Sequence, residues 1–93
     1  MLLGKDDARA IFSQNLAKTY DETLALLKKI GEVKSEDKAA GLIKGKVDGA
    51  DVNIKIEKGS DNKSQMVVSV RQMMIPKPEI AGGIIYQLKE RLK

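Results

Sequence analysis

A chain of 93 residues, 42% hydrophobic and 32% charged, has the composition of one globular domain, because it is too short to build two independent cores. It contains no cysteine and no histidine, which excludes disulfides, thiolate nucleophiles, thiolate metal sites and the commonest general base and zinc ligand. Its net charge of +4 favours solubility, and its sequence lacks the dense basic clusters of a nucleic-acid-binding tail.

The first residues have no hydrophobic period, so we expect a flexible lead-in over residues 1–7 and a single domain over residues 8–93. The apolar run from Met1 to Leu3 is shorter than the core of a secretory signal, and no window reaches the ~20 apolar residues of a membrane span. Ala8 to Phe12 has the residue types of a short edge strand, and whether it forms one is left open.

The segment from residue 15 to residue 30 has the spacing of an amphipathic helix. Ser13 or Asn15 supplies the N-cap oxygen, and Gly31 ends the helix. A start at Thr19 also fits a capping-box pattern but would leave Leu16 outside the stripe, so the earlier start is preferred. The apolar positions of the stripe are three or four residues apart: Leu16, Tyr20, Leu24, Leu27 and Ile30.

After Gly31 the period changes to two, which predicts antiparallel strands. We expect a strand over residues 32–35, a polar turn over residues 36–40 and a second strand over residues 41–47. Asp48 and Gly49 follow, and this pair favours a type I′ hairpin turn because both central residues need positive φ. That turn predicts the register of the hairpin: Val47 with Ala50, Lys46 with Asp51, Gly45 with Val52, Lys44 with Asn53, and Ile43 with Ile54.

The predicted register gives the hairpin one apolar and one charged face. Gly45 leaves space on the apolar face, and we expect a helix to fill it. Residues 59–64 are predicted to form a turn-rich loop. The alternation that begins at Met66 predicts a strand to Arg71, and the same pattern can be extended to Met74. Met73 and Met74 are interpreted as fillers under a sheet edge rather than as a docking surface.

Pro76 and Pro78 end this strand, and Pro78 suits the first position of a closing helix. Gly82 and Gly83 each cost about 1 kcal/mol inside a helix, so we expect a helix that becomes regular after Gly83 or a pair packed closely on the sheet. A phosphate-binding role for the pair lacks the other residues of a phosphate loop. The helix stripe is attributed to core packing rather than to membrane binding: Ala81, Ile84, Ile85, Leu88 and Leu92.

These elements predict an α+β fold of two layers, with an antiparallel meander sheet of four or five strands and two helices packed on one face. The order is a strand at residues 8–12, if it forms, then a helix, four strands and a final helix. Several stretches of this pattern resemble a family of small bacterial lipoproteins of unknown function. They are residues 20–31, 33–38, 41–46 and 48–49, then Val52, Ile54, Ile56 and residues 66–71.

The resemblance spans residues 8–92 and extends to the helix-grip domains of a lipoprotein component of the outer-membrane β-barrel assembly machinery. It implies a bacterial cell-envelope protein, periplasmic or anchored in a membrane, because such proteins carry a signal peptide and a lipid-bearing cysteine upstream. A chain that is complete as given would instead be cytoplasmic. The family implies an envelope protein as partner and brings no known catalytic residues, so none is carried over.

Carboxylates offer the remaining route to catalysis. Adjacent pairs occur at residues 6–7, 21–22 and 36–37, in the lead-in, on the helix and in a turn, where neighbours do not face each other. Asp48 and Asp61 lack the spaced oxygen ligands of a calcium loop. We therefore predict a non-enzymatic binding or structural domain with no catalytic residue, no cofactor and no metal site.

Nucleic-acid binding is the alternative, because helix, three strands and helix is also the order of the double-stranded-RNA-binding domain. No aromatic residue stands among the exposed strand positions, and the second helix opens on residues 76–79 (PKPE) rather than on clustered lysines. Asp51 and Glu57 also lower the net positive charge of the predicted basic sheet face. The candidate interaction face consists of four basic strand residues that this register places together: Lys44, Lys46, Lys55 and Arg71.

Overall fold

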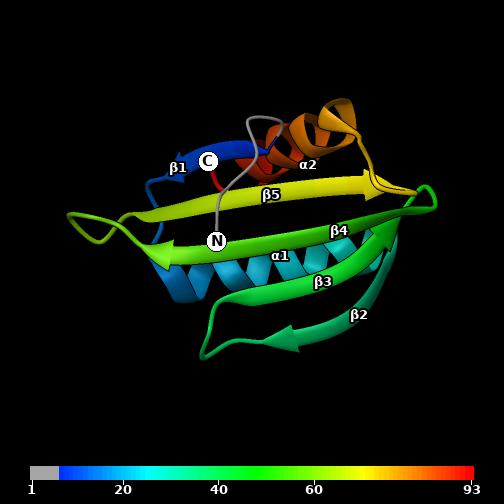
Figure 1. The fold of residues 1–93 in the computed structure, drawn as a ribbon. Coiled ribbons are helices and arrows are strands. Elements are labelled where there is room, and N and C mark those ends of the chain that lie inside the picture. The colour runs from blue at the N-terminus through cyan, green and yellow to red at the C-terminus, as the bar shows by residue number, and fades with distance from the viewer. Residues whose placement is uncertain (1–6) are drawn as a thin grey trace.

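Four successive strands pair with their sequence neighbours to form most of an antiparallel sheet, and a fifth strand joins it from the N-terminal part of the chain (Figure 1). The computed structural model describes residues 7–93. Among them the sheet has six strands in the order β1-β5-β4-β3-β2, with β6 also paired to β5. The elements are β1 (Ala8–Phe12), α1 (Leu16–Ile30), β2 (Glu32–Asp37), β3 (Leu42–Val47), β4 (Ala50–Lys58), β5 (Ser64–Gln72), β6 (Ile75–Pro76) and α2 (Pro78–Arg91).

This arrangement confirms the α+β class, the antiparallel meander and the two helices. The strand expected at residues 8–12 forms and lies antiparallel to β5, with Ala8 opposite Val68 and Phe12 opposite Ser64. The predicted flexible lead-in falls on residues 1–7, of which residues 1–6 lie outside the described part of the chain.

Helix α1 begins at Leu16, as the apolar stripe and the predicted N-cap at Asn15 indicated. The Asn15 side chain accepts a hydrogen bond from the backbone N–H of Lys18 at 2.9 Å, which satisfies one of the free donors at the helix N-terminus. At the other end the backbone N–H of Gly31 bonds to the carbonyl of Leu27 at 2.9 Å. Thus Asn15 rather than Ser13 is the N-cap.

The β3–β4 hairpin has the predicted register at every pair from Ile43–Ile54 to Val47–Ala50. Asp48 and Gly49 have φ of +52° and +79°, as a type I′ turn requires. A second turn of this kind, absent from the sequence-based prediction, joins β5 to β6 at Met73 and Met74, with φ of +51° and +70°. The strand expected to reach Met74 therefore ends at Gln72, because the chain reverses there.

Two features around β2 differ from the prediction. β2 continues to Asp37, two residues into the expected polar turn, because its register shifts by one residue between Val33 and Ser35 and pairing then resumes with β3. The pairing of β2 also corrects the expectation for Gly45. A Cβ atom there would overlap the backbone carbonyl of Glu32, so the space beside Gly45 is occupied by β2 and not by a helix.

Helix α2 runs without interruption from Pro78 to Arg91, through Gly82 and Gly83. Both predicted explanations for these glycines are wrong: the helix is regular before Gly83, and no described atom outside its own turns lies within 4 Å of a Cβ at either position. Of the predicted stripe, Ala81, Ile84, Leu88 and Leu92 are buried, and Ile85 is half-buried.

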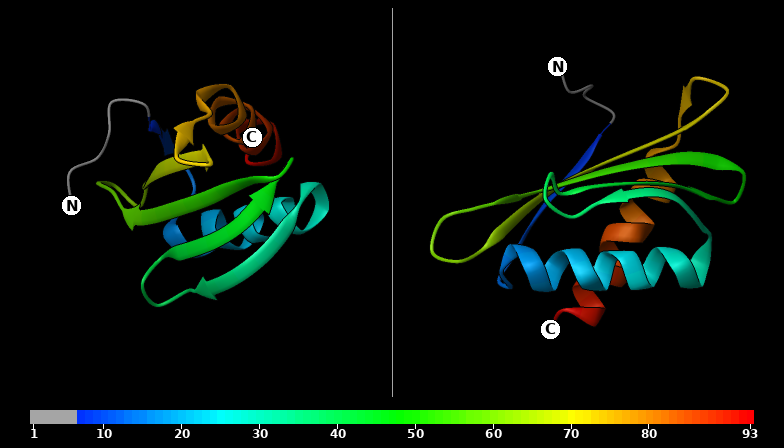
Figure 2. Two further views of the ribbon diagram at one scale, coloured as in Figure 1. Left: turned by 45° about the vertical axis from the view of Figure 1, so that its right-hand side comes forward. Right: turned by 90° about the horizontal axis from the view of Figure 1, so that it is seen from below.

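One face of the sheet carries the core. α1 contacts β2, β3 and β4 on this face, and α2 contacts β5 and β1, so that the two helices cover adjoining parts of it (Figure 2). Alternate strand side chains point toward the helices and are buried, and their neighbours along each strand point to the opposite side. The buried strand residues include Ile43, Val52, Ile54, Ile56, Met66, Val68 and Val70.

Candidate interaction face

The surface of the sheet opposite the helices is the candidate site, and we call it the open face. Figure 1 views it directly, with α1 behind the strands. Its side chains form rows across the strands, because residues paired in an antiparallel sheet stand side by side. The first row is Glu32, Lys46, Asp51 and Arg71; the second is Ser35, Lys44, Asn53 and Ser69; the third is Asp37, Leu42, Lys55, Val67 and Arg9; the fourth is Glu57, Gln65 and Ile11.

All four basic residues predicted from the sequence lie on the open face. Lys46 and Arg71 share the first row, Lys44 is in the second and Lys55 is in the third. The centre of the face is hollowed, and three of the four line this hollow: Lys44, Lys55 and Arg71. The structure therefore brings the predicted set together over three strands, β3, β4 and β5.

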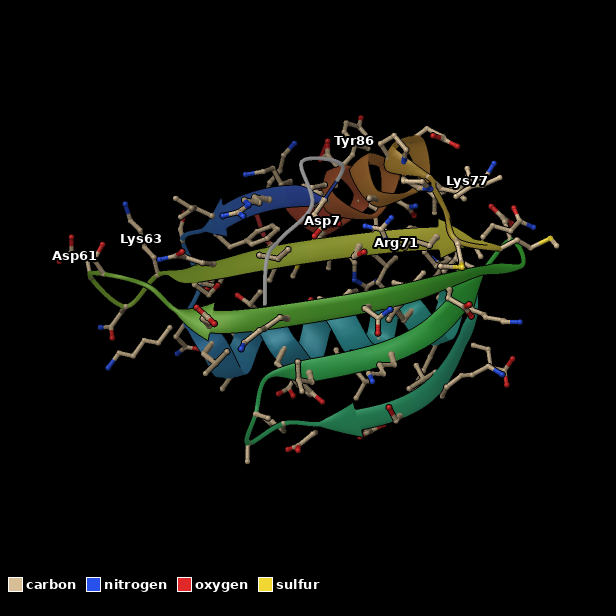
Figure 3. The ribbon with its side chains drawn as sticks, in the orientation of Figure 1. Asp7, Asp61, Lys63, Arg71, Lys77 and Tyr86 are labelled. Atoms are coloured by element: carbon tan, nitrogen blue, oxygen red, sulfur yellow. The ribbon has the colours of Figure 1, made fainter. Side chains whose placement is uncertain are left out.

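Acidic side chains stand beside most of these cations. Lys46 lies between Glu32 and Asp51 in its row, and Lys55 forms an ion pair of 3.3 Å with Glu57 on the same strand. Arg71 stands opposite Asp51 and lies 3.7 Å from a carboxylate oxygen of Asp7 (Figure 3). The open face is thus patterned with both signs of charge rather than uniformly basic.

Lys44 differs from the other three cations. Its neighbours in the row are Ser35 and Asn53, both uncharged. Across the next strand the row continues with Ser69, so that hydroxyl and amide groups flank the ammonium group. Within the described residues this row carries no carboxylate, which leaves the charge of Lys44 less compensated than that of its neighbours.

Three apolar side chains stand among the charged residues of the third and fourth rows. Leu42 is 37% exposed and Ile11 is 62% exposed, and Val67 is half-buried between their strands. All three line the hollow. Exposed apolar side chains interspersed with both signs of charge are typical of a surface that contacts another macromolecule.

Strand β1 supplies the part of the site that the sequence did not predict. Arg9 and Ile11 reach the open face because β1 pairs with β5, more than fifty residues away along the chain. Asp7 enters it through its ion pair with Arg71. Nothing in the local pattern of residues 7–12 indicates which strand they join, so only the pairing itself reveals these three residues.

Of the carboxylate pairs considered for catalysis, Asp21 and Glu22 lie on the protein surface in ion pairs. Asp21 contacts Lys38 at 2.9 Å, and Glu22 contacts Arg91 at 3.1 Å. Between residues 7 and 93 no group of three or more acidic residues is placed to hold a metal ion. Asp6 lies outside the described residues.

Tyr20 is an ionisable side chain buried in the core. Tyr20 is 2% exposed and its hydroxyl donates a hydrogen bond of 3.2 Å to the carbonyl oxygen of Leu42, at the edge of the open face. Burial raises the pKa of Tyr20, and the negative charge of Glu36 raises this pKa further. The phenol is therefore neutral at physiological pH and has a structural role between α1 and β3.

The β5–β6 turn is a second unusual surface. Met73 and Met74 are 88% and 89% exposed, and the adjacent Ile75 is 59% exposed. The interpretation of Met73 and Met74 as fillers under the sheet edge is therefore wrong; Met66 alone of the three middle-chain methionines lies in the core. The reason is the turn, whose tip projects past the end of the sheet.

No protein-family model matches the sequence, and a search of curated proteins found none with significant similarity. The helices described in residues 7–93 include none that is long and apolar enough to cross a membrane.

Proposed function

We propose that this chain is a non-enzymatic binding domain of the bacterial cell envelope that contacts a protein partner through its open face. The observation that carries the proposal is the open face itself: a sheet surface that no helix of residues 7–93 covers, with exposed Leu42 and Ile11 among rows of mixed charge. The absence of histidine and cysteine from the sequence supports binding over catalysis. The envelope location rests on the lipoprotein resemblance.

The composition of the face favours a protein over an enzyme substrate. Its polar groups are spread over four rows and five strands and do not converge on one point, whereas a catalytic site needs an acid, a base or a nucleophile within hydrogen-bond distance of the same atom. A large partner can contact all the rows at once. Leu42, Val67 and Ile11 then supply its apolar contacts, and the charged residues around them supply its polar contacts.

Double-stranded RNA is the second candidate, because the four predicted basic residues do share one face. The interleaved acids argue against it, since Glu32, Asp51 and Glu57 would each lie near a phosphate. A titration with short duplex RNA at low salt separates the two proposals. Salt-sensitive micromolar binding that is lost in Lys44→Glu and Lys46→Glu would favour RNA, and no binding would favour a protein partner.

Site-specific photo-cross-linking in cells tests the proposed face. A photoreactive residue is placed at Lys55 on the open face, and a matched control is placed at Lys28 on the exposed side of α1. We expect discrete protein adducts from position 55 and none from position 28. Equal adducts from both positions, or none from position 55, would contradict the proposal.

The location is tested separately by expressing the native open reading frame and fractionating the cells. We expect the protein in the envelope fraction, with an upstream signal peptide that ends in a cysteine. Recovery of the unprocessed protein in the cytoplasmic fraction would exclude an envelope location. The cross-linking experiment would then still test whether the open face binds a protein.

A further inference from the structure

We infer that the open face binds a second copy of this chain, so that two sheets pack face to face in a two-fold symmetric dimer. The inference deepens the proposed function, on which it rests, by naming the partner. It follows from the order of charges along the first row. From β2 to β5 this row reads negative, positive, negative, positive: Glu32, Lys46, Asp51 and Arg71.

Such a row is complementary to its own copy. A two-fold axis parallel to the strands, midway between β3 and β4, reverses the order of the strands and turns the open faces toward each other. Glu32 of one protomer then stands over Arg71 of the other, and Lys46 stands over Asp51. Each contact occurs twice, and every position of the row meets the opposite charge.

The second row also agrees with this axis. In the second row Lys44 meets Asn53 and Ser35 meets Ser69, which are polar pairs able to form hydrogen bonds. In the third row Asp37 meets Val67, and Leu42 meets the aliphatic stem of Lys55, which covers apolar surface. Arg9, on β1, lies outside the overlap of the two sheets, so this row adds no pair of opposite charges.

The overlapping part of the open face has the size of a weak dimer interface. The axis superposes the four strands β2 to β5, which at about 4.8 Å apart and roughly 25 Å long present about 480 Å² per copy, or about 960 Å² in total. This area is typical of a weak, transient interface, and two sheets packed about 10 Å apart with aligned strands are a common arrangement. We therefore expect a weak dimer with a Kd in the micromolar range, which high salt weakens because its rim is charged.

Sedimentation velocity of the purified chain from micromolar to millimolar concentration, at low and high salt, measures the association. In the dimer, Lys46→Glu places a glutamate over Asp51 at both symmetry-related contacts. We therefore expect Kd to rise at least about tenfold. Lys63→Glu makes the same charge change in the β4–β5 loop, away from the open face, and is expected to leave Kd unchanged. Thermal melts followed by circular dichroism establish that both variants are folded.

A double-mutant cycle on Glu32 and Arg71 identifies the axis. These residues belong to strands three positions apart in the sheet, roughly 14 Å, so they do not touch within one protomer. Glu32→Lys and Arg71→Glu should each weaken the dimer, and the double variant should recover affinity beyond the sum of the single effects. The cycle also cancels the loss of the Asp7–Arg71 ion pair, which occurs in both Arg71 variants.

Three results would overturn the inference: a monomer at all concentrations, a dimer that Lys46→Glu does not weaken, or additive effects at Glu32 and Arg71. The cross-linking experiment keeps the proposed function separate from this outcome. Adducts from position 55 with the mass of two chains agree with the dimer, whereas adducts of another mass from a monomeric protein support the open face with a different partner. Absence of adducts would contradict the proposed function itself.

Discussion

Thr19 and Ser64, which are 45 residues apart in the sequence, share a buried hydrogen bond of 2.7 Å between their hydroxyl groups. Both hydroxyl groups also reach the carbonyl oxygen of Gln14, Ser64 at 3.0 Å and Thr19 at 3.4 Å, so either one can donate the shared bond. Both side chains are completely buried. These hydrogen bonds tie the start of α1 to the start of β5 and to the segment between β1 and α1.

We predict that Ser64→Ala lowers the free energy of unfolding by about 1–2 kcal/mol, because it removes both hydrogen bonds of a buried hydroxyl. Ser60→Ala, in the exposed β4–β5 loop, should change it by less than about 0.5 kcal/mol. Urea denaturation of the two variants provides the comparison. Equal midpoints would show that the buried hydroxyl contributes nothing to stability.

The glycines of α2 should be replaceable with a gain in stability. Gly82→Ala and Gly83→Ala are each expected to raise the free energy of unfolding by about 1 kcal/mol, because alanine is the better helix former and the space around each position is open. Gly45→Ala is the contrasting variant, since its Cβ would overlap the Glu32 carbonyl and should destabilise the sheet. Loss of stability in the α2 variants would mean that the glycines are needed for packing.

The β5–β6 turn contains two methionines at positive φ, a conformation that costs roughly 1–2 kcal/mol for each residue with a side chain. Replacing Met73 by Asn and Met74 by Gly installs the preferred type I′ pair, and we expect the melting temperature to rise. The thermal melt of the double variant measures this gain. An unchanged or lower melting temperature would indicate that the exposed methionine side chains stabilise the turn.

The β3–β4 turn gives the converse test. Gly49 has φ of +79°, which a β-branched residue adopts only with strain, so Gly49→Val should lower the free energy of unfolding by at least about 1 kcal/mol. Asp48→Asn keeps a side chain that tolerates positive φ and should be nearly neutral. If thermal melts show Gly49→Val to be as stable as the parent chain, the turn geometry is wrong.

Tyr20 makes the free energy of unfolding depend on pH in the alkaline range. Its pKa in the folded protein is raised above the ordinary value of 10.0, so the neutral phenol is favoured by folding. Its contribution is present below pH 10 and is lost as the pH rises through the folded-state pKa. Tyr20→Phe cannot ionise, so the stability difference between parent and variant should shrink or reverse above pH 10, as measured by urea denaturation at each pH.

Such a decrease is specific to Tyr20 because both proteins contain the same lysines, whose titration in this pH range cancels in the difference. A stability difference that stays constant up to the highest pH at which both proteins fold would show that the phenol is not ionising from a buried state.

The short-range features of this fold were readable from the sequence. The stripe from Leu16 to Ile30 and the Asp48–Gly49 turn led to the correct helix, hairpin and register, because helix period and turn chemistry depend on residues close together in the chain. Met73 and Met74 show where this reasoning fails: neither is a typical residue for positive φ, so the turn had no local signal.

The amino-acid sequence by itself determined that each hairpin strand has one apolar and one charged side, and that Lys44, Lys46, Lys55 and Arg71 share a face. Only the tertiary structure decided what stands beside them. Arg9 and Ile11 enter the face because β1 pairs with β5, and Glu32 completes the alternating row because β2 pairs with β3. Local periodicity cannot specify either pairing, since it is burial of the common core that selects which distant strands meet.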